Sequence, residues 1–317
     1  MRNFTNFFGI VYITALISFT CPLFAQQPNQ ASDFEVELNR TGNGVIIKKY
    51  IGVINEVVIP EKIEGIPVAE IYGSTDFRFN RYDGAFLNSN VTSVVFPNTK
   101  ITIGPNAFRG SKVTSITLHI TIEDIGDNAF ADCLQLENVI INMNLRESSR
   151  QDSGGGYIRN RFASEIFSNC RKLKTVNLPT SMTNIPNGMF SGCSSLSTIT
   201  IPSSVKYIGS DAFRNCALAS LELPENVETI GKNAFDNNNL TTLKLSRQIR
   251  TIAVSAFANN SLTEVIIPNG IGRINFETVF GMKGGMPGNV SLAFLNNNLT
   301  LGNRAELIKL GYPSDEF

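Results

Sequence analysis

Short triplets with apolar first and third residues and a variable middle residue recur along the chain between residues 57 and 267. Many are followed directly by proline, as at Pro97, Pro179, Pro202 and Pro224. Period-two alternation that ends so soon at proline indicates a short β-strand with one buried face. The apolar members of the triplets are Val57/Ile59, Val94/Phe96, Ile116/Leu118, Val139/Ile141, Val176/Leu178, Ile199/Ile201, Leu221/Leu223, Leu243/Leu245 and Val265/Ile267.

A phenylalanine keeps the same period. Successive anchors lie 22 or 23 residues apart, except for 37 residues between Phe130 and Phe167, which is one period plus an insertion. The predicted ladder comprises Phe86, Phe108, Phe130, Phe167, Phe190, Phe213, Phe235, Phe257 and Phe280. An isolated unit with one short strand cannot bury its apolar side, whereas stacked units can. The sequence therefore predicts a mainly β repeat solenoid with parallel strands about 4.8 Å apart and a ladder of buried phenylalanines.

The two ends carry different patterns. Thr41-Gly42-Asn43-Gly44 between apolar runs predicts an N-terminal β-hairpin cap, and residues 303–310 predict a short C-terminal helical cap with Asn303 as its N-cap. We expect an N-terminal cap over 26–56 and a solenoid of about ten coils over 57–295, with an insertion at 142–161. A C-terminal cap over 296–317 completes the expected organisation.

Residues 1–25 predict a signal peptide. Arg2 precedes an uncharged run over 7–19, and Leu23-Phe24-Ala25 ends in a small residue. The run is too short for a transmembrane helix, which needs roughly 20 apolar residues. We predict cleavage after Ala25, with lipidation at Cys21 as the alternative. The protein is then exported to the cell surface, the outer envelope or the medium, with no transmembrane segment after cleavage.

The repeat resembles the BspA-type leucine-rich repeat of bacterial surface proteins. The resemblance rests on ITIPSSVKYIGSDAFRNC over 199–216, and the lead-in at 34–38, 44–47 and 63–68 is also similar. It covers about residues 33–295. The resemblance implies a curved, right-handed leucine-rich-repeat coil on exported proteins. It also implies adhesion to host matrix proteins, cells or other bacteria, and no catalytic residues.

Composition argues against several kinds of chemistry. Lys plus Arg and Asp plus Glu number 27 each, so no global field favours nucleic acid. His119 is the single histidine, which leaves little for acid/base chemistry. We predict no enzyme and no cofactor.

Four cysteines follow the predicted leader, each three residues after an anchor: Cys133, Cys170, Cys193 and Cys216. They predict an inward ladder of thiols. Disulfides between adjacent coils are the alternative, because the coil spacing suits them. No metal site is predicted, since the four lie along one line and lack CxxC spacing.

The outward-facing residues of the strands are the candidates for partner binding. Those we single out are Thr117, Ile140, Asn177, Thr200, Glu222, Lys244 and Ile266. The alternative is that such residues are there for strand propensity alone. The insertion adds Arg146, Arg150, Arg159 and Arg161 as further candidates, or else forms a solvated surface loop.

Two functional hypotheses follow. The first is an exported, non-enzymatic recognition module that binds a protein or cell-surface ligand through its strand face. The second is a structural or self-assembling component of the cell envelope, in which the partner is another copy of the chain.

Overall fold

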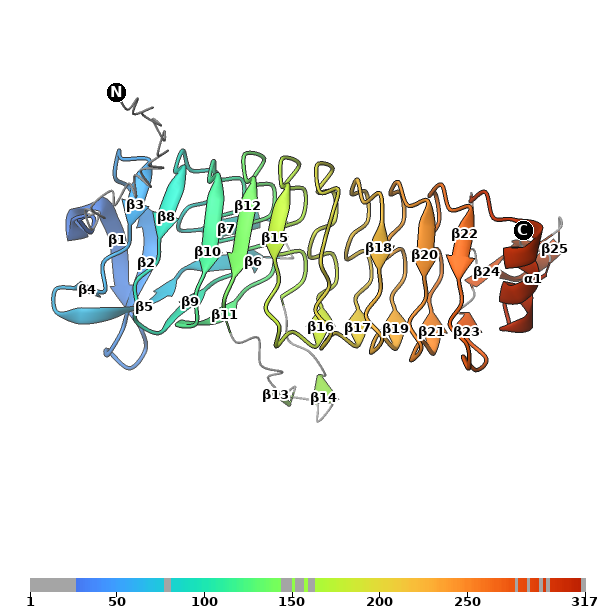
Figure 1. The fold of residues 1–317 in the computed structure, drawn as a ribbon. Helices are drawn as coiled ribbons and strands as arrows, with labels where there is room; N and C mark the ends of the chain where they lie inside the picture. The colour runs from blue at the N-terminus through green and yellow to red at the C-terminus, as the bar shows by residue number, and fades with distance from the viewer. Residues whose placement is uncertain are drawn as a thin grey trace, which may run out of the picture.

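The computed structural model describes residues 27–76, 81–143, 150–151, 157–158, 163–276, 279–283, 286–290, 293–294 and 297–314. The predicted leader and Cys21 lie outside these residues. Figure 1 shows an elongated solenoid with the N-terminal cap at one end and helix α1 (Leu301–Lys309) near the other. It has about nine turns rather than the predicted ten, because the last predicted repeat forms a different structure, described below.

The predicted triplets form one row of parallel strands along the solenoid, which we call the first row (Figure 1). Equivalent residues pair in register, as Leu243 does with Leu221 and Val265. The strands form three groups, β3 and β8, then β10, β12 and β15, then β18, β20 and β22. Their bounds are Glu56–Val58 (β3), Ser93–Val95 (β8), Ser115–Leu118 (β10), Asn138–Ile141 (β12), Thr175–Asn177 (β15), Leu221–Glu222 (β18), Thr242–Lys244 (β20) and Glu264–Ile266 (β22).

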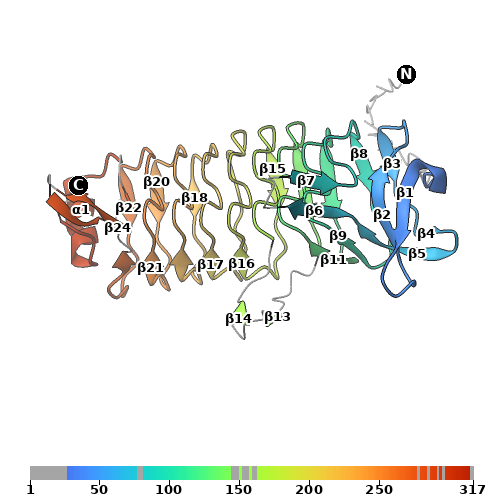
Figure 2. The same cartoon turned by 180° about the vertical axis from the view of Figure 1, so that it is seen from behind.

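A second row of parallel strands runs along the solenoid at the isoleucine that precedes each anchor (Figures 1 and 2). After this isoleucine two neighbouring turns approach closely. A Cβ on Gly231 would lie 2.6 Å from the backbone nitrogen of Ser210, so only glycine fits there. The strands are Ile101–Ile103 (β9), Ile122–Ile125 (β11), Asn184–Ile185 (β16), Tyr207–Ile208 (β17), Thr229–Ile230 (β19), Thr251–Ile252 (β21) and Asn275–Phe276 (β23).

The anchor rings stack through the centre of the solenoid. From Phe86 to Phe257, successive rings lie 4.6 to 5.8 Å apart between centroids and within 18° of parallel. All eight are fully buried. Each ring therefore covers the apolar faces of its two neighbours, which an isolated repeat cannot do.

The prediction is wrong at Phe280. That residue lies in β24 (Val279–Lys283), which pairs antiparallel with β25 (Met286–Val290). Phe294 takes the place in the stack instead, with its ring 5.6 Å from Phe257. The period of 23 residues predicts Phe280 as the next anchor, but a hairpin is inserted at this point and Phe294 stacks on Phe257 in its place.

Tight turns form a further ladder, in which each anchor from Phe108 to Phe257 sits between two residues with positive φ. These flanking residues have φ between 53° and 77°. Asn, Asp and Gly, which adopt left-handed backbone at least cost, hold most of these positions. In one turn the backbone nitrogens of Asp211, Phe213 and Asn215 donate to carbonyls of the next turn at 2.8 to 2.9 Å. We call this array the turn ladder.

The N-terminal cap is a β-hairpin, as the sequence indicates. Strands β1 (Phe34–Leu38) and β2 (Val45–Tyr50) pair antiparallel after a short 3-10 helix η1 (Ala31–Asp33). The sheet continues through β5 (Ile66–Ile71) into β9 and β11, with β4 (Lys62–Ile63) paired to β5. The cap therefore opens the second row.

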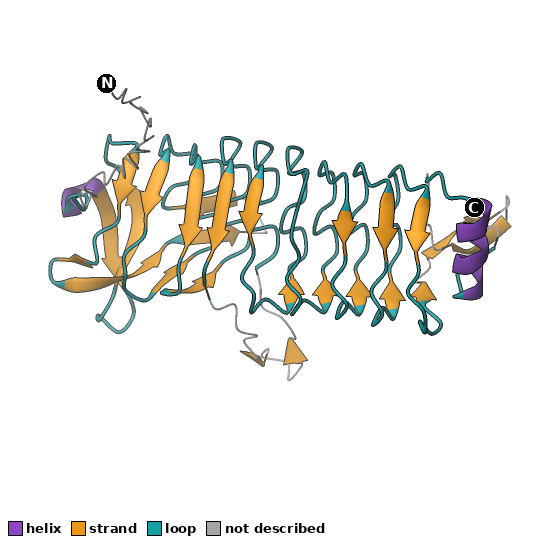
Figure 3. Ribbon diagram, viewed as in Figure 1, coloured by secondary structure: helices purple, strands orange, loops and turns teal. Residues whose placement is uncertain are grey.

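The C-terminal cap contains helix α1 (Leu301–Lys309), coloured purple in Figure 3. Its N-cap is Thr300, whose side chain accepts a hydrogen bond from the backbone nitrogen of Asn303. The prediction of Asn303 as N-cap is therefore wrong, because its side chain binds Val265 instead. Two further hairpins leave the solenoid, β6 (Gly73–Asp76) with β7 (Arg81–Gly84), and β13 (Arg150–Gln151) with β14 (Tyr157–Ile158).

Candidate functional site

The first row turns its middle residues toward solvent. The side chains singled out from the sequence, Thr117, Ile140, Asn177, Thr200, Glu222, Lys244 and Ile266, are all exposed. Their apolar neighbours in the strands point into the core, as the buried, exposed, buried pattern at β10 and β12 shows. The row therefore brings these residues to one face, in a line that extends over much of the solenoid.

The first row is interrupted in its middle. Residues 198–201 lie between β15 and β18, and among the described residues no backbone hydrogen bond ties them to either neighbouring turn. Ile199 and Val176 are half-buried, whereas the equivalent Val139 and Leu243 are buried. The prediction of a strand at Ile199/Ile201 is therefore wrong: the chain passes there without joining the ladder.

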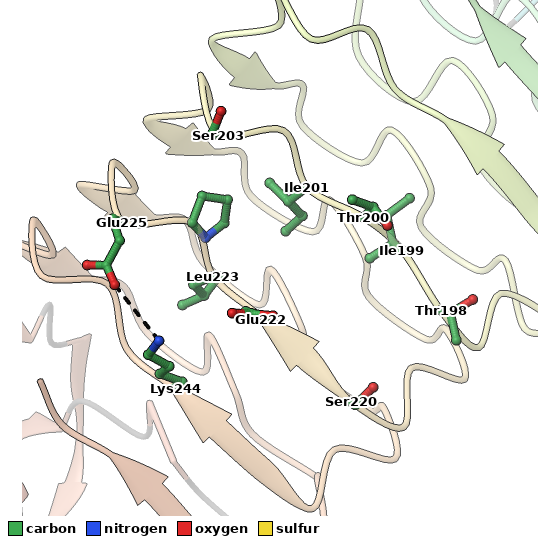
Figure 4. Close-up of a pocket in the computed structure, with 11 residues that line it drawn as sticks. Thr198, Ile199, Thr200, Ile201, Ser203, Ser220, Glu222, Leu223, Glu225 and Lys244 are labelled. Atoms are coloured by element: carbon green, nitrogen blue, oxygen red, sulfur yellow. Dashed lines mark ion pairs between the residues drawn. The ribbon is translucent and has the colours of Figure 1, made fainter.

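A hollow of about 370 Å³ lies beside this interruption. Its apolar lining comes from Ile199, Ile201, Leu223 and Pro224. Its polar lining consists of the hydroxyls of Thr198, Thr200, Ser203 and Ser220 and the charged groups of Glu222, Glu225 and Lys244. Figure 4 shows these side chains around the hollow, with Thr198 and Ser220 toward one end and Ser203 toward the other.

The charged groups of the hollow differ in their contacts. Glu225 lies 3.9 Å from the Lys244 ammonium and 3.7 Å from the Arg247 guanidinium. Glu222 is exposed and forms no ion pair within the part of the chain that the structure describes. The hollow thus offers one free carboxylate, hydroxyl groups and an apolar floor, which suits a polar segment of a protein partner better than a bond-making reaction.

Sequence reasoning identified Thr200, Glu222 and Lys244 but not the hollow that brings them together. It also missed Ser203 and Glu225, which lie just beyond the prolines that end two triplets. Nothing in the sequence distinguishes this triplet from its neighbours, because Ile199/Ile201 has the same alternation as the rest.

The arginine-bearing insertion is described only in part. Arg150 lies in β13 and pairs with Ile158 of β14. The other three candidates, Arg146, Arg159 and Arg161, lie outside the described residues. The insertion remains a prediction as a contact site.

The cysteines occupy one buried position in four consecutive turns. Each thiol donates to the carbonyl of the anchor one turn earlier, as Cys170 does to Phe130 at 3.2 Å. All four are free thiols. Burial raises the pKa of Cys133 and Cys216 to about 12 and raises the pKa of Cys170 and Cys193 well above the usual value. These thiols are poor nucleophiles, because the thiolate is the reactive form.

The repeat itself decides the family. The model of the BspA type leucine-rich repeat region matches in six copies over residues 81–151 and 160–282, more than half of the chain. The chain belongs to this family. Leucine-rich repeats of this kind are protein-interaction modules.

Several solved structures are similar to this leucine-rich repeat protein. A leucine-rich repeat protein of T. pallidum is 22% identical over 90% of this chain and 97% of its own, with a TM-score of 0.39. A leucine-rich cell surface protein of Faecalibacterium prausnitzii is 21% identical over 78% of this chain and 72% of its own, with a TM-score of 0.40. A leucine-rich repeat protein of Bacteroides ovatus is 18% identical over 77% and 78%, with a TM-score of 0.43. The family assignment rests on the repeat model alone, and no curated protein matches the chain.

Other chemistry finds little support in the described residues of this leucine-rich repeat protein. They contain no group of three or more His, Cys, Asp and Glu side chains that could hold a metal ion. His119 is half-buried, and its Nδ1 shares a hydrogen bond with the Thr121 hydroxyl. In the same part of the chain, no helix has the length and apolar character needed to cross a membrane.

Proposed function

We propose that this leucine-rich repeat protein is an exported, non-enzymatic recognition module that adheres to a protein or cell-surface ligand. Host matrix proteins, host cells and other bacteria are the expected targets. The ligand lies along the first row, centred on the hollow between Thr198 and Lys244. The arginine-bearing insertion over 142–161 is a second contact region.

The hollow carries this proposal. It is one of two places where the first row loses its regular hydrogen bonding, and here part of the core is exposed at Ile199. Partly exposed apolar side chains surrounded by hydroxyls and a free carboxylate form the usual make-up of a protein-binding patch. The thiols, by contrast, are buried and hydrogen-bonded within the core, which gives them a structural role.

Self-assembly in the envelope is the weaker alternative. Stacking of copies end to end needs open sheet edges, and both ends of the first row are closed by asparagine side chains, as described in the next subsection. A solenoid whose first row is closed at both ends has no template there for another copy.

The test is binding of the purified protein to a panel of matrix proteins, epithelial cells and bacterial cells. Two substitutions in the hollow, Thr200→Arg and Lys244→Glu, should reduce binding at least tenfold, because each places bulk or the opposite charge against the docked ligand. Lys232→Glu is the matched control, since Lys232 is exposed, lies outside the first row and undergoes the same change of charge.

A control variant that loses as much binding as the two hollow variants would contradict the assignment of the site. A protein that binds no member of the panel would contradict adhesion itself. Deletion of residues 144–160 separates the contribution of the insertion, which should be smaller than that of the hollow.

A further inference from the structure

A solenoid made of two strand rows has four terminal sheet edges, and each is a row of backbone groups that another strand can pair with. In this protein the four terminal strands are β3 and β22 for the first row, and β1 and β23 for the second row and its cap. We therefore compare the four terminal strands by whether other residues bind or cover their outer backbone groups.

An asparagine closes each end of the first row. At β3, the backbone nitrogen of Asn29 donates to the Val58 carbonyl at 2.9 Å, and its side-chain oxygen accepts from the Val58 nitrogen at 2.8 Å. At β22, the Asn303 side chain accepts from the Val265 nitrogen at 3.2 Å and donates to the Val265 carbonyl at 2.9 Å. Each asparagine thus occupies both groups of one residue, as a paired strand would.

The C-terminal segment covers the third edge. The nitrogen of Ile274, next to β23, donates to the Leu310 carbonyl at 2.9 Å. The ring of Tyr312 packs against Phe276 of β23 at 5.1 Å. The second row therefore ends beneath the residues that follow α1.

The fourth edge, that of β1, is open. Within the described residues β1 pairs with β2 alone, although it is five residues long. Val36 and Leu38 lie opposite Ile47 and Val45, both buried, and so face the core side of the sheet. They nevertheless remain 41% and 54% exposed, because none of the described strands lies beyond them.

Opposite charges lie beside each other on the other face of this sheet. Ile46 of β2 stands between Glu70 of β5 and Glu37 of β1 in the register, and Lys48, two residues further along β2, lies 3.1 Å from Glu37. Glu35 of β1 likewise stands opposite Lys49 of β2. An additional strand beside β1 would meet Glu35 and Glu37 and would continue this arrangement if it carried cations.

The same charges disfavour pairing of β1 with a second copy of itself. Antiparallel self-pairing brings glutamates of one copy opposite glutamates of the other, and like charges directly opposite are destabilising. Acidic residues on an exposed edge are a known means of preventing such association.

We propose that the free edge of β1 binds an extended segment of another protein in which basic residues alternate with apolar ones, and that this segment joins the sheet as its next strand. Its apolar side chains cover Val36 and Leu38, and its basic side chains pair with Glu35 and Glu37. Backbone hydrogen bonds supply affinity, and the alternating side chains supply specificity.

The probe is a labelled synthetic peptide, acetyl-Thr-Lys-Val-Lys-Val-Lys-Thr-amide, titrated against the purified protein by fluorescence anisotropy. We expect saturable binding at micromolar to millimolar concentration. Replacement of lysine by glutamate in the peptide should abolish binding. Two further peptides are methylated on alternate backbone nitrogens, one on each of the two alternating sets, which keeps the charge and removes hydrogen-bond donors. Binding should be abolished in the peptide whose methylated nitrogens face β1 and kept in the other.

The matched protein variants carry two Glu→Gln changes each. Glu35→Gln with Glu37→Gln should weaken binding about threefold to tenfold, since two cross-strand ion pairs are lost. Glu165→Gln with Glu306→Gln removes two exposed carboxylates that lie outside both β1 and the first row, and should leave binding unchanged. Glu35→Lys with Glu37→Lys should reverse the preference and favour the glutamate peptide.

Three results would overturn the proposal. The first is absence of binding at millimolar peptide. The second is a lack of selectivity. This would be seen if both Glu→Gln double variants weakened peptide binding equally, or if the two methylated peptides bound equally well. The third is concentration-dependent self-association of the unmodified protein that the Glu35→Lys with Glu37→Lys variant alters, because the partner is then a second copy.

Discussion

One buried position explains much of the variation among the repeats. Three residues after the anchor, Cys133, Cys170, Cys193 and Cys216 donate to the anchor carbonyl of the preceding turn. In later turns Asn238, Asn260 and Asn297 do the same with their side-chain nitrogens at 2.8 Å. A donor at this position therefore ties each of these turns to the one before it, and Cys and Asn both supply that donor.

The thiols make stability sensitive to alkaline pH. Burial raises their pKa in the folded protein, so the folded chain keeps protons that the unfolded chain loses above pH 9 or so. The thiols' contribution to the free energy of unfolding is complete below about pH 9 and is lost as the pH rises toward their pKa in the folded protein. Between these two pH values, we expect the free energy of unfolding to fall by about 1 kcal/mol per thiol for each unit of pH increase.

Urea denaturation between pH 8 and pH 11, with a reductant present, measures this effect. A variant with all four cysteines replaced by serine is the control, since Ser111 holds the same position in an earlier turn. Its stability should fall less steeply with pH. Parallel profiles of the two proteins would refute the prediction.

The repeated element is one turn of the solenoid. Its strands, its anchor ring and its tight turns each contact their counterparts in the neighbouring turns. The ring of Phe213 lies 5.5 Å from Phe190 and 5.3 Å from Phe235, so one side chain serves three turns. The turn ladder needs left-handed residues on both sides of the ring, which explains the frequent Asn and Asp there. A change at the ring therefore disturbs adjacent elements as well as its own.

Phe213→Ala should lower the free energy of unfolding by about 3 to 5 kcal/mol, because it leaves a cavity between two buried rings. Thr200→Ala, at an exposed position of the neighbouring turn, should change it by less than about 0.5 kcal/mol. Chemical denaturation of both variants provides the measurement. Equal effects would show that the ring stack does not hold the turns together.

The whole molecule is a stack of turns, and the backbone edges at its two ends determine whether another strand can pair with it. The asparagines at β3 and β22 close the first row, the C-terminal segment covers β23, and β1 stays open. The hollow near the middle of the first row is a further irregular feature. Candidate contacts thus lie where the regular stacking of turns stops.

Asn303→Ala should open the edge of β22. The loss of two hydrogen bonds should lower stability by about 1 to 3 kcal/mol. The freed backbone of Val265 should also promote association that increases with protein concentration. Asn298→Ala is the control, because Asn298 is exposed and contributes its backbone rather than its side chain to the cap.

Analytical ultracentrifugation over a hundredfold range of concentration tests the association. If Asn303→Ala remains monomeric over the whole range, the asparagine stabilises the cap without protecting the edge.

The repeat could be predicted from the sequence because each repeat carries the same short signals, namely the alternating triplet and the phenylalanine anchor, and these recur many times along the chain. The alternating triplets and the period of the anchors specify parallel stacking, and eight anchors lie in the stack as expected. Phe280 keeps the period, yet Phe294 is the ring that follows Phe257 in the stack, since spacing along the chain cannot reveal an inserted hairpin. The hollow at Ile199 was equally invisible, because the sequence there matches the repeat as well as its neighbours do.

By itself, the sequence determined the solenoid, its family and the outward position of the strand residues, because these follow from periodicity and burial within one turn. Only the tertiary structure decided where the turns cease to pair and how the ends are closed. Those features depend on contacts between residues far apart in the chain, such as Asn303 with Val265, which no local pattern records. The free edge of β1 belongs to the same class, since an edge is defined by the absence of a neighbour among the described strands.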